Sequence, residues 1–192
     1  MKLLEERILR DGKIGAGNVL KVVESIEEDT ILFGPDTNLG KFVEPHTDKK
    51  IIPIPGDGHC YVHKLFHIED IEDARAKHPN AEIIIHPESN KEVQDLADYV
   101  LSTGGMLSHI KNSDKKEFVI GTEVDLITRL KAEIPDKTYY PLLEGAICGT
   151  MKLHTLEKLR DCLVNEEPVV TVPQDIAENS INAVERMLEA SK

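Results

Sequence analysis

Two stretches of this chain form a weak tandem repeat. Residues 31–60 read ILFGPDTNLGKFVEPHTDKKIIPIPGDGHC, and residues 118–148 read FVIGTEVDLITRLKAEIPDKTYYPLLEGAIC. A pattern that recurs at a fixed spacing indicates one structural unit used more than once. We therefore expect two copies of an α/β unit, each ending in a cysteine just after a strand. The aligned pairs, 87 or 88 positions apart, are Gly34 with Gly121, Asp36 with Glu123, Leu39 with Leu126, Pro53 with Pro141 and Cys60 with Cys148.

Short apolar runs alternate with helical patterns along the whole chain. Several of these runs, such as residues 83–85, are entirely apolar and β-branched, which is typical of parallel strands covered on both faces. Strands are predicted at residues 30–34, 50–55, 81–86, 99–102, 117–121, 138–142 and 168–172. Helices are predicted at residues 1–10, 18–25, 38–43, 68–77, 91–98, 124–134, 155–164 and 175–190, with another opening after residue 102. The prediction is an α/β fold of tandem pseudo-symmetric αβα units with parallel sheets.

Composition limits the classes of partner. The 192 residues carry a formal net charge of −12, and Trp is absent. Nucleic acid is therefore not an expected partner, because nucleic-acid recognition favours a basic face and aromatic stacking platforms. The sequence contains no apolar run near the roughly 20 residues that span a bilayer, and it opens on a charged segment instead of a signal peptide. A cytoplasmic protein without a membrane partner is the expectation.

The cysteines are too few for a disulfide framework. Cys60 lies in GDGHCYVH, where glycines allow a tight bend and His63 can lower the pKa of the thiol or join a metal site. Cys148 lies in GAICGTMK, where a buried apolar role and a functional role both remain open, and the repeat favours function. Cys162 falls inside a predicted helix without a repeat partner and is interpreted as packing. Equivalent cysteines beyond equivalent strands suggest one shared point between two domains.

Two further segments follow predicted strands. His86 and Glu88 can supply acid–base chemistry or hold a polar ligand, although Pro87 and Glu88 are equally typical of an ordinary helix entry. Ser102 and Thr103 open the STGGM segment, whose hydroxyls and backbone N–H groups suit a phosphate or carboxylate. An ordinary strand-to-helix turn with a capping residue is the alternative for that segment.

Taken in order, these motifs resemble the quinolinate synthase family over about residue 18 to the C-terminus. The resemblance rests on GPDTNLG at 34–40, GHCYVH at 58–63, HPE at 86–88, STGGM at 102–106, GTE at 121–123 and CGTMK at 148–152. It implies three similar α/β domains around a pseudo-threefold axis and a [4Fe–4S] cluster held by one cysteine per domain. The implied reaction condenses iminoaspartate with dihydroxyacetone phosphate to quinolinate, in de novo NAD biosynthesis.

By this resemblance, Cys60 and Cys148 are two of the three cluster ligands. His86 and Glu88 match the family's catalytic His and Glu, and His63 is a further candidate site residue. Ser102 and Thr103 match its substrate or phosphate contacts. The implied domains are a partial second domain at residues 1–62, a third domain at 63–148 and a helical segment at 149–192.

The sequence also departs from the family. The first domain, with the third cluster cysteine, has no counterpart, and Ala16 stands where the family usually has a serine. Two thiolates alone are expected to hold a cluster poorly. A partner chain that supplies the first domain, or self-association through the apolar stripe of the last helix, is therefore expected. The alternatives are a non-catalytic relative that serves as a binding or assembly module without a cluster, and a remnant with free thiols.

Overall fold

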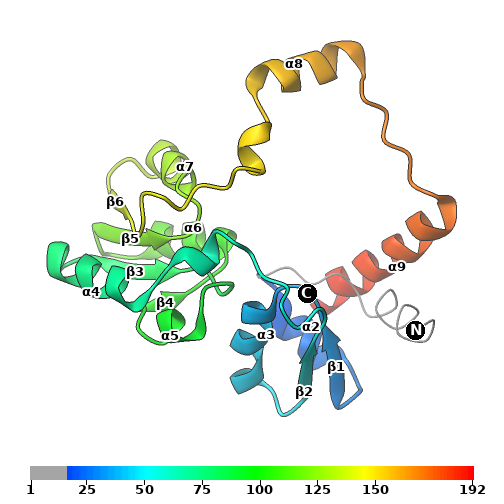
Figure 1. Cartoon of the computed structure of the whole chain (residues 1–192), viewed down its shortest axis with the longest axis horizontal. Coiled ribbons are helices and arrows are strands. Elements are labelled where there is room, and N and C mark those ends of the chain that lie inside the picture. The colour runs from blue at the N-terminus through cyan, green and yellow to red at the C-terminus, as the bar shows by residue number, and fades with distance from the viewer. Residues whose placement is uncertain (1–16) are drawn as a thin grey trace. The chain divides into compact units, whose positions relative to one another are not determined.

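A computed structural model describes residues 17–192 of the chain. The predicted helix at residues 1–10 and the Ala16 position lie outside the described residues. The chain divides into two compact units, one running from Ile14 to Ile147 and one containing Cys148–Lys192. Figure 1 shows the helices and strands of both units, which are described separately below.

The larger unit begins with a two-stranded parallel sheet. Its strands are β1 (Thr30–Phe33) and β2 (Lys50–Pro53), with Ile31 paired to Ile51. Helix α2 (Val19–Ser25) precedes β1, while α3 (Thr37–Val43) and the 3₁₀ turn η1 (Glu44–His46) connect the strands. Because parallel strands need a crossover connection, α3 packs back on the sheet. The shared core consists of Val19, Val23, Ile31, Phe33, Leu39, Val43 and Ile51.

A four-stranded parallel sheet follows in the same unit. Its strands are β3 (Glu82–Ile85), β4 (Tyr99–Val100), β5 (Glu117–Gly121) and β6 (Thr138–Pro141), in the order β4-β3-β5-β6. The register pairs Ile84 with both Tyr99 and Ile120. The two parallel sheets confirm the predicted α/β class, whereas the domain division at residues 62 and 148 stays a prediction.

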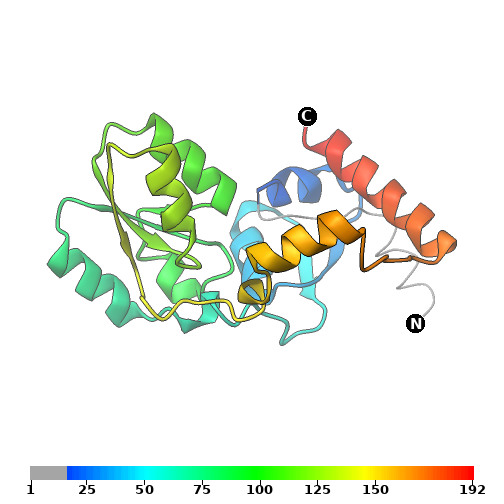
Figure 2. The same ribbon diagram turned by 90° about the horizontal axis from the view of Figure 1, so that it is seen from above.

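Helices cover both faces of the four-stranded sheet. Helices α6 (Thr103–Asn112) and α7 (Leu126–Glu133) lie on one side, and α4 (Ile68–Lys77) and α5 (Lys91–Gln94) on the other (Figures 1 and 2). Strand side chains alternate between these faces, as expected from the period of two. The core on the α6 and α7 side consists of Ile84, Met106, Ile110, Phe118, Ile120, Ile127, Leu130, Ile134 and Tyr139.

The repeated sequence corresponds to a repeated order of elements. The series β1, α3, β2, η2 (His63–Leu65), α4 is followed later by β5, α7, β6, η3 (Met151–Leu153), α8 (Leu156–Asn165). Both copies have a glycine directly at the end of the first strand. At Gly34, an added Cβ would overlap the backbone oxygen of Ile54. At Gly121, it would stand 2.5 Å from a side-chain carbon of Ile85. A neighbouring backbone therefore lies too close for a side chain at Gly34, and the side chain of Ile85 does at Gly121.

The smaller unit contains η3, α8 and α9 (Gln174–Ala190). Thr155 caps α8, with its hydroxyl accepting the N–H of Lys158 at 3.3 Å. The strand predicted at residues 168–172 is wrong, because this segment is irregular and its valines are exposed. A strand requires a hydrogen-bonding neighbour, which apolar β-branched composition alone does not supply. Cys162 is exposed on α8, so the prediction that it packs in a core is also wrong.

The other boundary differences are small. The predicted helix at residues 91–98 ends at Gln94, because the following turn directs the chain into β4. Asp98 stabilises that turn: its backbone N–H donates to Ile83 O at 3.0 Å, and its carboxylate accepts the N–H of Ile83 at 2.8 Å. Strand β4 itself is limited to Tyr99–Val100, shorter than the predicted residues 99–102.

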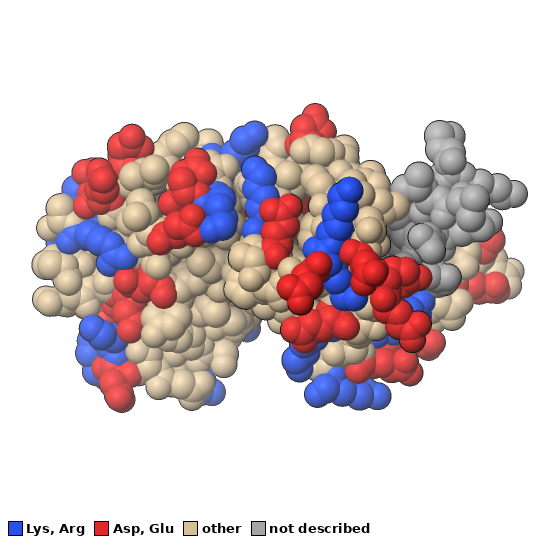
Figure 3. Space-filling view, turned by 90° about the horizontal axis from the view of Figure 1, so that it is seen from below, with Lys and Arg blue, Asp and Glu red and all other residues tan. Residues whose placement is uncertain are grey.

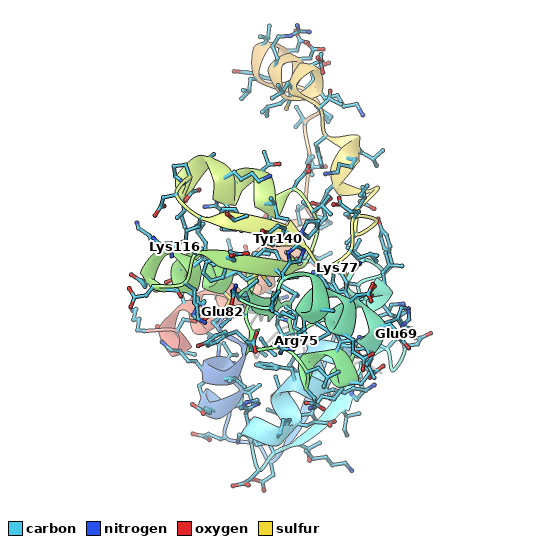
Figure 4. The ribbon with its side chains drawn as sticks, turned by 90° about the vertical axis from the view of Figure 1, so that its left-hand side faces the viewer. Glu69, Arg75, Lys77, Glu82, Lys116 and Tyr140 are labelled. Carbon is cyan, nitrogen blue, oxygen red and sulfur yellow. The ribbon has the colours of Figure 1, made fainter. Side chains whose placement is uncertain are left out.

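The surface carries charged side chains of both signs among many uncharged ones (Figure 3). Acidic and basic residues are intermixed on the face drawn in Figure 3. In Figure 4, Arg75 and Lys77 extend from α4, and Arg75 forms an ion pair with Asp98 at 3.0 Å. Tyr140, labelled in the same view, stacks on His78 with ring centroids 3.6 Å apart. Among residues 17–192, no helix combines the length and apolar character needed to cross a bilayer.

Candidate functional site

Polar side chains gather where strands of the larger unit end. Asp36 follows β1, Cys60 and His63 follow β2, His86 and Glu88 follow β3, and Thr122 follows β5. Ligand sites of parallel α/β sheets lie at the carboxyl ends of strands, because the connecting loops converge there. The contacts below bring side chains from both sheets into one cluster.

Cys60, His63 and Glu88 form the centre of this cluster. One ligand-type atom from each, the sulfur, a ring nitrogen and a carboxylate oxygen, all lie within 4.8 Å of one another. His63 Nδ1 lies 3.0 Å from Glu88 Oε2. His63 is buried, whereas Cys60 and Glu88 are half-buried. A thiol, an imidazole and a carboxylate in contact are a set typical of catalytic or metal sites.

Two neighbours fix the ring of His63. Its Nε2 lies 2.8 Å from the buried hydroxyl of Thr122, so the ring is bonded on both nitrogens. The ring of His86 stacks on it, with centroids 4.1 Å apart and planes 9° from parallel. His86 Nδ1 also lies 3.8 Å from Glu88 Oε2. The two histidines and the carboxylate are therefore held in a defined arrangement before any ligand enters.

Burial and mutual charge set the protonation states. Burial alone would lower the pKa of His63, but hydrogen bonds and charges from Cys60 and Glu88 outweigh it and raise the pKa to about 9. The hydrogen bond from His63 in turn lowers the pKa of Cys60 and that of Glu88. Burial, aided by the charge of His63, lowers the pKa of His86 to about 4. Near neutral pH, His63 is therefore charged and His86 neutral.

The start of α3 holds the loops of the cluster. Asp36 Oδ1 accepts the N–H groups of Asn38 at 2.6 Å and Leu39 at 3.1 Å, and Oδ2 accepts the N–H of Cys60 at 2.5 Å. Asn38 Nδ2 donates to the backbone oxygen of Glu88 at 3.1 Å and lies 3.4 Å from Asn90 Oδ1. Asp36 thus positions the cysteine loop, and Asn38 positions the loop that carries Glu88.

The remaining predicted site residues lie elsewhere. Ser102 is the capping residue of α6, with its hydroxyl accepting the N–H of Gly105 at 3.1 Å, and Thr103 is exposed at the first turn. Both follow β4 at the carboxyl edge of the four-stranded sheet, but their role in substrate contact stays a prediction. Cys148 is a half-buried cysteine of the smaller unit. The prediction that it shares a site with Cys60 likewise stays a prediction.

Sequence reasoning missed three residues of the cluster. Thr122, Asp36 and Asn38 contact or position the central side chains, yet none was assigned a role. A signal was present for two of them. Asp36 belongs to a repeat pair with Glu123, and Thr122 directly follows an apolar run in the same way as His86. Asn38 lies in the GPDTNLG motif of the family resemblance, but no local pattern indicates its partners about 50 residues away.

Comparisons with known proteins identify the class. The profile of the family described as "Quinolinate synthetase A protein" matches residues 8–189, so the chain belongs to this family. A quinolinate synthase of Methanothermobacter thermautotrophicus is 55% identical over 190 residues, covering 99% of this chain. Quinolinate synthases of Methanocaldococcus jannaschii and Pyrococcus furiosus are 46% and 44% identical, covering 96% and 97% of it.

The match covers only part of those relatives. The chain spans 62% of the length of the Methanothermobacter protein, and 61% of each of the other two. The predicted family is therefore confirmed. The activity, substrates and partners of the whole relatives are proposals for this chain, as are the roles of individual residues.

Proposed function

We propose that this chain carries the larger part of a quinolinate synthase active site, which condenses iminoaspartate with dihydroxyacetone phosphate in NAD biosynthesis. The cluster of Cys60, His63, His86 and Glu88 at the strand ends carries the proposal. It is supported by family membership along nearly the whole chain. The part of the relatives that this chain does not match would complete the site, in cis or as a separate polypeptide.

The protonation states suit a carboxylate-rich substrate that must gain and lose protons. His63, charged at neutral pH, can donate a proton or hold an anionic group. Glu88, whose pKa is lowered by the hydrogen bond from His63, stays ionised and can accept a proton. Neutral His86 can donate one ring N–H to a carbonyl or hydroxyl oxygen without adding charge. These three side chains are the proposed catalytic residues, with Ser102 and Thr103 as proposed substrate contacts.

Cys60 suits the cofactor that the family resemblance implies. It is a free, half-buried thiol, and the hydrogen bond from His63 lowers its pKa, which favours the thiolate needed for iron. Cys148 would be the second cluster ligand, with the third outside this sequence. When bound, a [4Fe–4S] cluster with one open iron would supply a Lewis acid for substrate oxygen atoms.

A chimeric enzyme tests this function. The matched segment of the Methanothermobacter relative would be replaced by this chain, and the relative's remaining sequence would supply the rest of the site. After anaerobic reconstitution with iron and sulfide, we expect quinolinate to form from iminoaspartate and dihydroxyacetone phosphate. Glu88→Gln should lower kcat/KM by roughly 100-fold or more, because it removes a proton acceptor while keeping the side-chain shape.

A matched control separates chemistry from folding. Glu92→Gln changes a carboxylate in the first turn of α5, close in sequence but absent from the cluster, and should leave kcat/KM within about twofold. The binding-module alternative makes the opposite prediction. A chimera that folds and holds its cluster, yet forms no quinolinate, would favour that alternative.

A further inference from the structure

Glu123 is a buried carboxylate that the proposed chemistry does not use. It lies between β5 and α7, and only 8% of its surface is exposed. Its Oε2 accepts the N–H of Asp125 at 2.9 Å. A buried carboxylate is costly unless its oxygen atoms are hydrogen-bonded or its charge is paired. We therefore expect the second oxygen of Glu123 to accept a hydrogen bond as well, and the repeat indicates from which group.

Asp36, the repeat counterpart of Glu123, bonds two segments at once. Its Oδ1 accepts the N–H of Asn38, two residues further on, just as Glu123 accepts the N–H of Asp125 two residues further on. Its Oδ2 accepts the N–H of Cys60. The bond to the second residue after the carboxylate therefore occurs in both copies. An equivalent of the bond to the cysteine is expected in the second copy.

The backbone beside the two carboxylates is repeated as well. In the first copy, the residue after the carboxylate donates its N–H to Gly58 O at 2.7 Å, and Gly58 N donates to Pro55 O at 3.1 Å. In the second copy, the residue after the carboxylate donates its N–H to Ala146 O at 3.1 Å, and Ala146 N donates to Leu143 O at 3.1 Å. Gly58 and Ala146 each stand two residues before a cysteine. Each carboxylate therefore lies beside the loop that leads to the cysteine of its own copy.

We infer that Glu123 is a positioning residue for Cys148: its carboxylate accepts the backbone N–H at the junction of Ile147 and Cys148, as Asp36 does for Cys60. The contact itself is inferred from the repeat, whereas its role in the reaction rests on the proposed function, in which Cys148 is a cluster ligand. Groups that orient the ligands of a metal site contribute to its affinity without touching the metal. Glu123 acts in this way, through the loop.

Amide hydrogen exchange of the cysteines tests the contact without iron or substrate. Selective ¹⁵N labelling of cysteine in the full chain gives one backbone amide signal each for Cys60, Cys148 and Cys162, and single serine variants assign them. In Glu123→Ala the amide of Cys148 should exchange about tenfold faster or more, because a hydrogen bond to a charged acceptor is lost. The amides of Cys60 and Cys162 should not change. Asp36→Asn should give the reverse pattern, with faster exchange at Cys60 and none at Cys148.

A matched control separates this contact from a general effect of removing a carboxylate. Glu133→Ala removes an exposed carboxylate in α7 that pairs with Arg129, and it should leave all cysteine amides unchanged. Glu123→Gln keeps the size of the side chain and one acceptor oxygen, so it should speed exchange at Cys148 by about threefold or more. Circular dichroism shows whether each variant folds. If Glu123→Ala does not fold, Glu123→Gln decides the question.

The chimera of the proposed function tests the role of Glu123 at the cluster. At limiting iron, Glu123→Ala should hold about tenfold less cluster than the parent, measured as protein-bound iron and absorption. Glu123→Asp keeps both carboxylate oxygens and should restore most of that occupancy. A chimera that assembles no cluster at all would contradict the proposed function, while the exchange rates would still decide the contact.

Two results would overturn the inference. One is a Cys148 amide that is equally protected in the parent chain, in Glu123→Ala and in Glu123→Gln. The other is a chimera whose cluster occupancy is the same with and without the Glu123 carboxylate.

Discussion

The two copies of the repeated unit share their backbone but differ in their chemistry. In the first copy, the N–H of Lys64 donates to Cys60 O at 3.2 Å, and in the second the N–H of Lys152 donates to Cys148 O at 3.1 Å. The loop before each cysteine is also held in the same way. Thr37 N donates to Gly58 O at 2.7 Å, and Val124 N donates to Ala146 O at 3.1 Å.

The side chains around the two cysteines are not repeated. Three residues after Cys60 stands the buried His63, whereas three residues after Cys148 stands Met151, which is 58% exposed. Glu88 lies beyond the repeated stretch, which ends at Cys60 in the first copy. The comparison suggests that the repeat is a scaffold for presenting a thiol, and that the acid–base side chains gather around the cysteine of the first copy, with Thr122 of the second copy bonded to His63.

The largest effect is expected from the backbone that both copies share. Gly34→Ala would place a methyl group against the backbone oxygen of Ile54, which cannot turn away as a side chain can. We expect it to lower the free energy of unfolding by about 3 kcal/mol or more. Gly121→Ala meets the side chains of Ile85 and Leu142 and should cost about 1–3 kcal/mol. Urea unfolding of the purified chain measures both changes.

Gly104 is the control for these two substitutions. It lies in α6, and an added Cβ would meet nothing within 4 Å. Gly104→Ala should leave stability unchanged or raise it by up to about 1 kcal/mol, since alanine favours helix. If Gly34→Ala proved as harmless as Gly104→Ala, a close neighbour at the end of the first strand would not be what the two copies have in common.

A smaller effect is expected from Asp36, the side chain that links the scaffold to Cys60. Its buried carboxylate accepts three backbone N–H groups, those of Asn38, Leu39 and Cys60. Asp36→Ala removes a helix cap and leaves buried donors without acceptors, so we expect a loss of about 2–3 kcal/mol in unfolding free energy. Asp36→Asn keeps one acceptor oxygen and should cost about half as much.

Amide hydrogen exchange shows which residues Asp36 positions, which a change in the free energy of unfolding does not. The amide of Cys60 should exchange faster in Asp36→Asn, because its acceptor is lost, while amides in α6 should not change. Asp73→Asn removes an exposed carboxylate that pairs with Lys77 in α4, and its effect should stay within about 0.5 kcal/mol. Equal protection of Cys60 in Asp36→Asn and in the parent chain would contradict the positioning role of Asp36.

The sequence predicted the fold better than the site, and the two differ for a physical reason. Strand and helix positions follow from local periodicity, so β3 and β5 were located within a residue of their ends. The segment at residues 168–172 has the composition of a strand but is irregular, because pairing depends on a distant neighbour. Composition alone cannot supply that information.

The cluster of Cys60, His63 and Glu88 was likewise predictable only where its residues are close in the sequence. Cys60 and His63 were singled out together because they are close in the sequence and flanked by glycines. The bond from His63 to Thr122 joins residues 59 positions apart, and no local pattern indicates it. Family resemblance indicated His86 and Glu88, but their stacking and ion-pair contacts with His63 became visible only once the loops were placed.

The smallest effect on stability is expected from Asn38, which links the first copy of the repeat to the loop that carries Glu88. Its Nδ2 donates to Glu88 O at 3.1 Å. Asn38→Ala should lower the free energy of unfolding by about 1 kcal/mol, the usual net worth of a hydrogen bond. Asn112→Ala, which removes an exposed bond to Ser108 O within α6, is the matched control and should cost less. Because Asn38 holds the Glu88 loop and not the Cys60 loop, the amide of Ser89 should exchange faster in Asn38→Ala, while the amide of Cys60 should keep its protection. Unchanged exchange at Ser89 would show that the Glu88 loop keeps its place without α3, and the chemical difference between the two copies would then rest on Cys60 and His63.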